Sequence, residues 1–133
     1  MLNWVITMPN DTLSRVRRLL GDDTMQRLAE VRVIIFGTGG VGSWCVDALV
    51  RTGLRHLTIV DSDVVVESNV NRQLMATHHT IGQPKVMALR NHLLSIAPYA
   101  FIEALQGRYT TDTAEQFRLE EYDYVVDAID SVP

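Results

Sequence analysis

Hydrophobic residues recur at two different spacings along the chain, and the change from one spacing to the other predicts the order of its elements. Near the start, Leu13, Val16 and Leu20 follow the three- and four-residue spacing of an amphipathic helix, which Gly21 should end. A second short helix should follow directly, with Asp23 as its N-cap. The first thirty residues are therefore expected to be helical.

After these helices, short apolar runs alternate with helical patterns. Runs rich in β-branched and other apolar residues predict four strands, at residues 31–36, 56–60, 100–106 and from 122. Helical patterns separate them, at residues 40–53, 83–98 and 113–120. This alternation is typical of an α/β, doubly wound, mainly parallel sheet with helices on both faces. The short N-terminal helices precede it.

Composition places few further limits on the chain. Its 133 residues, 47% hydrophobic with a net charge of -4, suit one globular domain and argue against a broad nucleic-acid surface. The single cysteine, Cys45, excludes an internal disulfide and a zinc site of several thiolates, which favours a cytoplasmic setting. No apolar run approaches the length of about 20 residues that crosses a bilayer, and the first residues lack the pattern of a signal peptide.

A glycine-rich turn between the first strand and the next helix predicts a phosphate site. The sequence GTGGVG supplies Gly37, Gly39 and Gly42 of a G-x-G-x-x-G pattern, with Gly40 as an extra glycine. Glycine permits a tight turn and a close approach of the backbone to a ligand, and the following helix points free N–H groups at an anion. Asp61 ends the next strand, where an acidic residue accepts hydrogen bonds from ribose hydroxyls. We therefore expect a Rossmann-like nucleotide site.

The glycine pattern fits a dinucleotide as well as ATP, and other residues favour ATP. Arg72 lies in a loop, at residues 62–81, that is longer than most strand-to-helix connections. Lys85 stands in the first turn of the next helix, where the dipole disfavours a cation unless an anion compensates. Arg72 and Lys85 could neutralise a triphosphate, and Asp130 could hold Mg²⁺ beside it. The alternative is that these three residues are ordinary surface charges.

Several motifs, in order and spacing, resemble one family. FGTGGVGSW, VDSDVVVESNVNRQL, GQPKV and YDYVVDAIDSV are similar to the ThiF/MoeB/HesA superfamily of ubiquitin-activating-like enzymes, over about Leu13 to Val132. Within it, NVNRQ and DAIDSV look most like the tRNA threonylcarbamoyladenosine dehydratases, the TcdA or CsdL group. The sulfur-carrier adenylyltransferases more often carry a glutamine before the arginine.

The resemblance implies ATP and Mg²⁺ as cofactors and assigns a role to each motif residue. The nucleotide would be lined by the turn glycines, Gly37, Gly39, Gly40 and Gly42. Its ribose would be held by the strand-end carboxylate Asp61, and its phosphates by Asn71, Arg72 and Lys85. Asp130 would ligate Mg²⁺.

The resemblance also implies catalysis across a homodimer. Arg15, in LSRVRRLLG, matches a family element whose arginine reaches the phosphates bound by the other subunit. Arg15 would then act in trans, together with Arg72 and Lys85, on the charge of the leaving pyrophosphate. Arg17 and Arg18 depart from the residues expected beside it.

The implied reaction is adenylation. A carboxylate attacks the α-phosphate of ATP, pyrophosphate leaves, and a reactive acyl-adenylate forms. In the dehydratases the carboxylate belongs to the threonylcarbamoyl group of a tRNA adenosine, whose activated carbonyl closes a ring. Three alternatives stay open: an adenylyltransferase that activates a ubiquitin-like sulfur-carrier protein, an NAD-dependent oxidoreductase, and a non-catalytic nucleotide-binding module.

We expect residues 1–10 to form a flexible lead and residues 11–133 to form the nucleotide-binding domain. The chain stops at Pro133, just past the fourth strand, where a doubly wound sheet normally continues. We therefore expect an N-terminal fragment of a longer, membrane-free enzyme.

Some reactive residues carry no function in this interpretation. Cys45 lies among apolar helix residues and is expected to be a small, buried, inert side chain. His78 and His79 are adjacent in a polar loop and cannot easily share one metal. Trp4 and Trp44 lack the basic surroundings of a base-stacking platform.

Overall fold

The computed structural model describes residues 10–130 and begins with two short helices, α2 (Asn10–Leu20) and α3 (Asp22–Glu30). The lead expected at residues 1–10 lies, for residues 1–9, outside the described part. Both predicted helices are confirmed. Only a narrow face of α2 is buried, so Leu13 is buried whereas Leu20 is exposed. Asp23 does not cap α3: the helix follows Gly21 without a side-chain cap, and Asp23 lies in its first turn.

Four parallel strands form one sheet in the order β3-β2-β1-β4. They are β1 (Arg32–Phe36), β2 (His56–Asp61), β3 (Phe101–Gln106) and β4 (Tyr124–Asp127). The register sets Ile35 of β1 between Ile59 of β2 and Val126 of β4. Because β1 is an inner strand, the chain builds the sheet first to one side and then to the other, which is the doubly wound topology that the alternation predicts.

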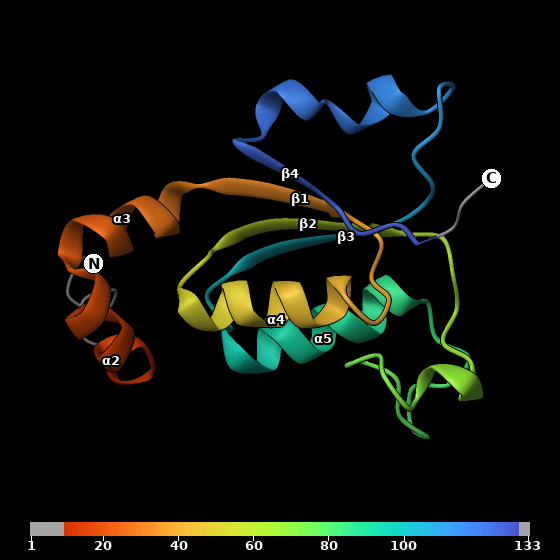
Figure 1. Ribbon diagram of the computed structural model, residues 1–133, viewed down its shortest axis with the longest axis horizontal. Helices are drawn as coiled ribbons and strands as arrows, with labels where there is room; N and C mark the ends of the chain where they lie inside the picture. The colour runs from red at the N-terminus through yellow and green to blue at the C-terminus, as the bar shows by residue number, and fades with distance from the viewer. Residues whose placement is uncertain (1–9, 131–133) are drawn as a thin grey trace.

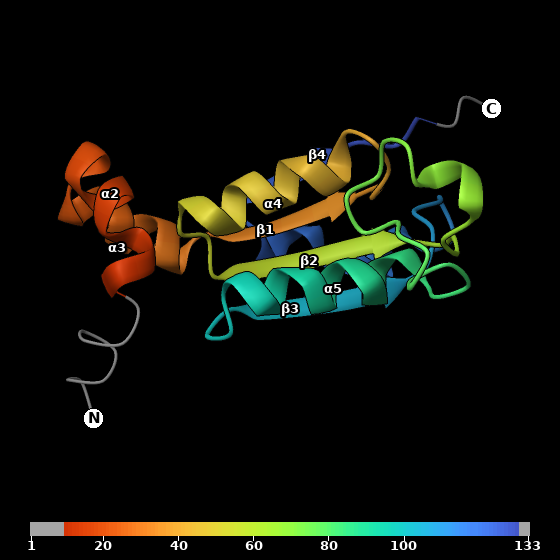
Figure 2. The ribbon, with the colours of Figure 1, turned by 90° about the horizontal axis from the view of Figure 1, so that it is seen from below.

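Helices α4 (Gly42–Thr52) and α5 (Lys85–Ile96) cover one face of the sheet (Figure 2). The main core lies beneath them and includes Ile35, Ile59 and Leu89, all fully buried. Both helices begin two residues later than predicted, at Gly42 and Lys85, since Val41 still belongs to the glycine turn and Pro84 caps α5. No helix within residues 10–130 is long and apolar enough to cross a membrane.

The opposite face carries two 3-10 helices, η2 (Ala114–Phe117) and η3 (Leu119–Glu121), drawn above the sheet in Figure 1. The continuous helix predicted over 113–120 is wrong, because Arg118 takes a left-handed conformation, with φ of 49°, between the two. This break lets Phe117 and Leu119 both pack on the small apolar cluster of that face.

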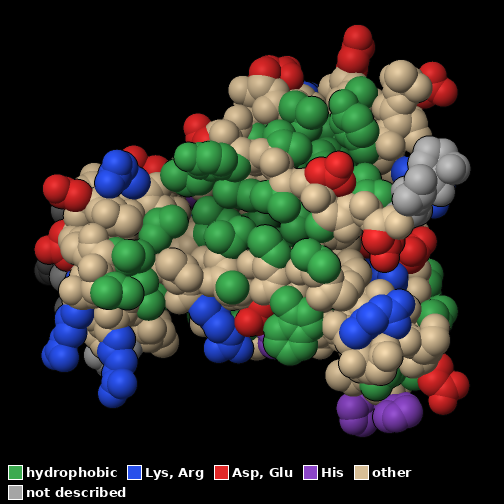
Figure 3. All heavy atoms as spheres, viewed as in Figure 1, with side chains coloured by type: hydrophobic (Ala, Val, Ile, Leu, Met, Phe, Trp, Pro, Cys, Tyr) green, Lys and Arg blue, Asp and Glu red, His purple; other side chains and the backbone are tan. Residues whose placement is uncertain are grey.

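The sheet leaves apolar side chains uncovered. Along β4, Tyr124 is 64% and Val125 48% exposed, and Phe101 on β3 is 67% exposed. Figure 3 shows hydrophobic side chains gathered across the middle of one face, between the 3-10 helices and the two covering α-helices. In residues 10–130, therefore, the second face is only partly covered.

The remaining elements are loops at the carboxyl ends of the strands. The long connection between β2 and α5 contains one 3-10 helix, η1 (Glu67–Asn69), and an isolated bridge from Val64 to Pro84 joins its two ends. The carboxyl ends of the strands point away from α2 and α3 (Figure 2). The loops that follow the strands therefore lie at one end of the sheet.

Candidate nucleotide-binding site

A hollow of about 500 Å³ opens at the carboxyl ends of the strands. Each strand contributes to its wall: Gly37 follows β1, Asp61 ends β2, Gly107 follows β3 and Asp130 follows β4. This is the place where open α/β sheets bind their ligands. Residues that lie far apart in the sequence therefore meet around one cavity.

The glycine turn forms the floor of this hollow, and two of its glycines are required by packing. Gly37 has φ of 94°, and a Cβ there would lie 2.6 Å from the carbonyl oxygen of Ala128. A Cβ on Gly42 would lie 2.0 Å from the carbonyl oxygen of Gly37. These two positions bring the turn, the start of α4 and the end of β4 together.

At the other two glycines, Gly39 and Gly40, an added Cβ would not clash with the backbone. A Cβ on Gly39 would meet only the Gln73 side-chain nitrogen, at 3.7 Å, and one on Gly40 would meet the Arg72 side chain at 3.4 Å. Gly37 and Gly39 line the hollow, whereas Gly40 and Gly42 are not among its lining residues.

Asp61, the expected ribose ligand, is held rigidly. Its Oδ2 accepts hydrogen bonds from the Thr38 backbone N–H (2.8 Å) and hydroxyl (2.9 Å). Its Oδ1 accepts one from the Asp63 backbone N–H, at 2.8 Å. A carboxylate oxygen can accept more than one hydrogen bond, so Asp61 keeps acceptor capacity toward the hollow that it lines.

Lys85 lies in the wall of the hollow although it is only 5% exposed. Its ammonium Nζ stands 3.5 Å from Oδ2 of the exposed Asp63, and its backbone N–H donates to the Asp63 carbonyl oxygen. A buried ammonium needs compensating negative charge. The exposed Asp63 supplies one such charge, and an anion in the hollow would add to it at the start of α5.

Arg72 also lines the hollow, and its guanidinium is held by its own loop. Nη1 donates to the Ser68 carbonyl oxygen at 3.0 Å and to Asn71 Oδ1 at 2.9 Å. The Arg72 carbonyl oxygen accepts from the indole N–H of Trp44 on α4, at 2.9 Å. Asn71 is not a lining residue; in this structure it orients Arg72.

Asp130 is exposed at the rim of the hollow that Lys85 and Arg72 also line. Within residues 10–130, no group of three histidine, cysteine or acidic side chains could hold a metal by itself. Mg²⁺ characteristically binds through one or two carboxylates together with phosphate oxygens and water. Asp130 at the edge of a phosphate site suits that donor set, and a site made of protein ligands alone does not occur in the described part.

Arg15 does not reach this hollow within its own chain. It is exposed on α2, and α2 lies at the other end of the sheet from the loops (Figure 1).

Sequence reasoning missed several residues of the site. Thr38, fully buried, fixes Asp61, and its place inside the glycine turn was the available signal. Ser43 Oγ donates to the Gly39 carbonyl oxygen (2.6 Å) and accepts from the Leu74 N–H (3.2 Å), which ties the glycine turn to the long loop. Arg108 and Tyr109 also line the hollow. No motif indicated these last contacts.

The structure also places the residues for which the sequence indicated no function. Cys45, expected to be buried, is only half-buried, and it packs against the main core. His78 and His79 are exposed in the long loop. Trp44 instead has a role that its motif did not reveal, the hydrogen bond to Arg72, while Trp4 lies outside the described residues.

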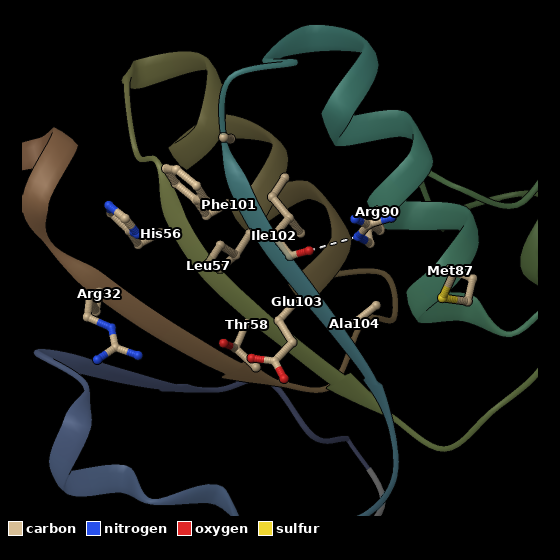
Figure 4. A pocket seen from close by; sticks show the side chains of 11 residues that line it. Arg32, His56, Leu57, Thr58, Met87, Arg90, Phe101, Ile102, Glu103 and Ala104 are labelled. Atoms are coloured by element: carbon tan, nitrogen blue, oxygen red, sulfur yellow. Dashed lines mark hydrogen bonds between the residues drawn. The ribbon is translucent and has the colours of Figure 1, made fainter.

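A second hollow, of about 590 Å³, lies beside β2 and β3 (Figure 4). Arg32, His56, Glu103 and Arg90 contribute polar atoms, and Arg90 Nε donates to the Ile102 carbonyl oxygen at 2.7 Å. It has no glycine turn and no lysine, so among the described residues these two features occur together only in the first hollow.

Fold and hollow together define a Rossmann-like domain of the doubly wound α/β class. Residues 13–133 match the ThiF family, and the chain belongs to it. The chain is 40% identical over 119 residues to tRNA threonylcarbamoyladenosine dehydratase of Bacillus subtilis, covering 90% of this chain and 47% of that one. It is 33% identical over 114 residues to a sulfur carrier protein adenylyltransferase of Thermus thermophilus, covering 86% and 42%.

Solved structures agree with this assignment. The chain superposes on Escherichia coli tRNA N6-threonylcarbamoyladenosine dehydratase in complex with ATP with a TM-score of 0.89 and 34% identity, covering 92% of this chain and 51% of that one. The predicted family and α/β fold are therefore confirmed. The chain spans about half the length of these relatives.

Proposed function

We propose that this domain binds ATP within an adenylating enzyme, and that the enzyme is a tRNA threonylcarbamoyladenosine dehydratase. One observation carries the proposal: a buried lysine and an arginine line the same hollow as the glycine turn and Asp61. A triphosphate carries more negative charge than the pyrophosphate of a dinucleotide, so it balances the charges of Arg72 and Lys85 more fully. The relatives and the ATP complex named above support the same choice.

In this proposal the chain's own residues bind and orient the nucleotide. Asp61, fixed by Thr38, accepts from the ribose hydroxyls, and the glycine turn approaches the phosphates. Lys85 and Arg72 stabilise the negative charge that moves onto pyrophosphate when a substrate carboxylate attacks the α-phosphorus and the bond to the β-phosphate oxygen breaks. Mg²⁺, held in part by Asp130, would neutralise charge on the phosphate oxygens.

The substrate, partner and setting belong to the whole protein. We propose a tRNA-bound threonylcarbamoyl group as the carboxylate, a cytoplasmic location, and a homodimer in which Arg15 of one copy approaches the phosphates of the other. The position of Arg15, exposed and remote from its own hollow, supports a role between copies.

A second candidate is an adenylyltransferase that activates a ubiquitin-like sulfur-carrier protein. The likeness to the Thermus thermophilus enzyme favours it. Formation of an acyl-adenylate on such a protein, with none on threonylcarbamoyl-modified tRNA, would support this candidate instead.

Calorimetric titration of the chain with ATP and Mg²⁺, and separately with NAD⁺, tests the binding site. We expect saturable ATP binding that weakens without Mg²⁺. Lys85→Met should weaken ATP binding at least tenfold, about 1.4 kcal/mol, because it removes a buried charge beside the phosphates. Asp130→Asn should remove most of the Mg²⁺ dependence, whereas Asp23→Asn, at an exposed position of α3, should leave both unchanged.

Binding of NAD⁺ in place of ATP would contradict the proposal and favour an oxidoreductase. ATP binding that Lys85→Met leaves unchanged would show that the nucleotide lies elsewhere. ATP binding by the longer enzyme without any ATP–pyrophosphate exchange would favour a non-catalytic module.

A further inference from the structure

Gln73 is a buried side chain in the wall of the nucleotide hollow with an unpaired polar atom. It is only 6% exposed and lines the hollow together with Gly39 and Arg72. Its Oε1 is buried and has no hydrogen-bond partner. Among the described residues, one other buried side-chain atom shares this condition, Nε of Arg55, which lies outside the hollow.

The backbone around Gln73 is fixed from several sides. Its N–H donates to the Asn69 carbonyl oxygen at 2.9 Å. The carbonyl of the preceding Arg72 is held by Trp44, and the N–H of the following Leu74 by Ser43. Both anchoring residues belong to the first turn of α4, beside which the long loop runs (Figure 2). The chain therefore presents this one side chain to the hollow in a set position.

The amide nitrogen of Gln73 faces the glycine turn. A Cβ on Gly39 would lie 3.7 Å from Nε2, so the glycine leaves space between the turn and the amide. An amide nitrogen only donates hydrogen bonds, and a phosphate oxygen at neutral pH accepts them. Buried polar groups are nearly always paired in the state that performs the function.

We propose that Gln73 is a further nucleotide-contacting residue, whose Nε2 donates a hydrogen bond to a phosphate oxygen of the nucleotide beside Gly39. This inference rests on the proposed binding of ATP. A phosphate oxygen has no proton to give to Oε1, so the contact is made through Nε2 alone. Gln73 thus adds a neutral, directional contact to the charges of Arg72 and Lys85.

Two substitutions of similar size separate this role from a structural one. Gln73→Met keeps the volume without polar atoms, and Gln73→Glu keeps the oxygen, loses the donor and adds negative charge. Gln116→Met and Gln116→Glu, at an exposed position of η2, are the matched controls. ATP affinity in Mg²⁺ is measured by calorimetry, and thermal unfolding is measured without nucleotide.

Gln73→Met should weaken ATP binding about tenfold, and Gln73→Glu should weaken it further through repulsion of the phosphates. Without nucleotide, Gln73→Met should unfold at the same or a higher temperature than the unsubstituted chain, because an apolar side chain replaces a buried unpaired atom. Both Gln116 variants should match the unsubstituted chain.

Unchanged ATP affinity in Gln73→Met would overturn this inference while leaving the proposed ATP binding intact. A lower unfolding temperature with unchanged affinity would assign Gln73 to structure alone. Tighter ATP binding by Gln73→Glu would also overturn it, since Oε1 would then face a cation. Absence of ATP binding in the unsubstituted chain would instead refute the proposed function.

Discussion

The glycines of the turn have two different structural roles. Gly37 and Gly42 let backbone segments approach within distances that no Cβ permits, while Gly39 leaves space toward Gln73. The sequence pattern predicted a close approach to a ligand for all of them. The structure shows that the closest approaches are between segments of the protein itself.

Gly37→Ala should lower the free energy of unfolding by more than Gly82→Ala. Both glycines have φ of 94°, so both substitutions cost about 1–2 kcal/mol in backbone strain. At Gly82 nothing lies within 4 Å of the new Cβ, whereas at Gly37 the Ala128 carbonyl must also move. The additional cost at Gly37 should be about 1–3 kcal/mol, measured by urea unfolding. Equal losses would show that the Ala128 segment moves aside freely.

Residues at element ends were predictable, and residues that act through other residues were not. Asp61 ends a strand and Lys85 begins a helix, so the order of elements alone brings them to one rim. Thr38 and Gln73 acquire their roles only through neighbours that lie far away in the sequence. Those neighbours depend on how the loop folds, which no local pattern specifies.

At the scale of elements, the short apolar runs gave the correct result, and all four strands are confirmed. β1 and β2 are buried, as continuous apolar runs predict for inner parallel strands, whereas β3 and β4 are partly exposed. The segment 113–120 was predicted as one helix, yet it forms two 3-10 helices. Packing of Phe117 and Leu119 on the sheet outweighs a weak local helical preference there.

Helix α4 and the long loop depend on Ser43 for their connection. Ser43 is fully buried and bonds both the Gly39 carbonyl and the Leu74 N–H. Ser43→Ala leaves both groups without this partner and should lower the free energy of unfolding by about 1–3 kcal/mol. The exposed Ser95→Ala should change it by less than about 0.5 kcal/mol. Similar unfolding midpoints for the two variants in urea would mean that the loop does not need this connection.

At the scale of the whole molecule, the described sheet ends at an open edge. β4 pairs with β1 on one side, and Tyr124 and Val125 on it are exposed. An apolar strand edge is a template for pairing with another chain. This edge therefore offers a contact between copies that is distinct from the proposed homodimer through Arg15.

Sedimentation velocity should detect this pairing as a mass that rises with concentration beyond that of the proposed homodimer. Val125→Lys places a charge on the exposed side of β4 and should abolish the association beyond that state. Ile81→Lys, which adds the same charge to the exposed long loop, should behave as the unsubstituted chain does. If both variants associate equally, β4 is not the surface involved.

The position of β4 beside β1 also determines when the hollow can exist. The last described strand pairs with the first, and Ile129 and Asp130 complete a wall that begins at Phe36 and Gly37. During synthesis a ribosome must therefore release the chain as far as Asp130 before these walls meet. A nucleotide that needs all of them recognises only the sheet with β4 in place, so its binding would report that β4 has joined β1 and not the earlier stages of folding.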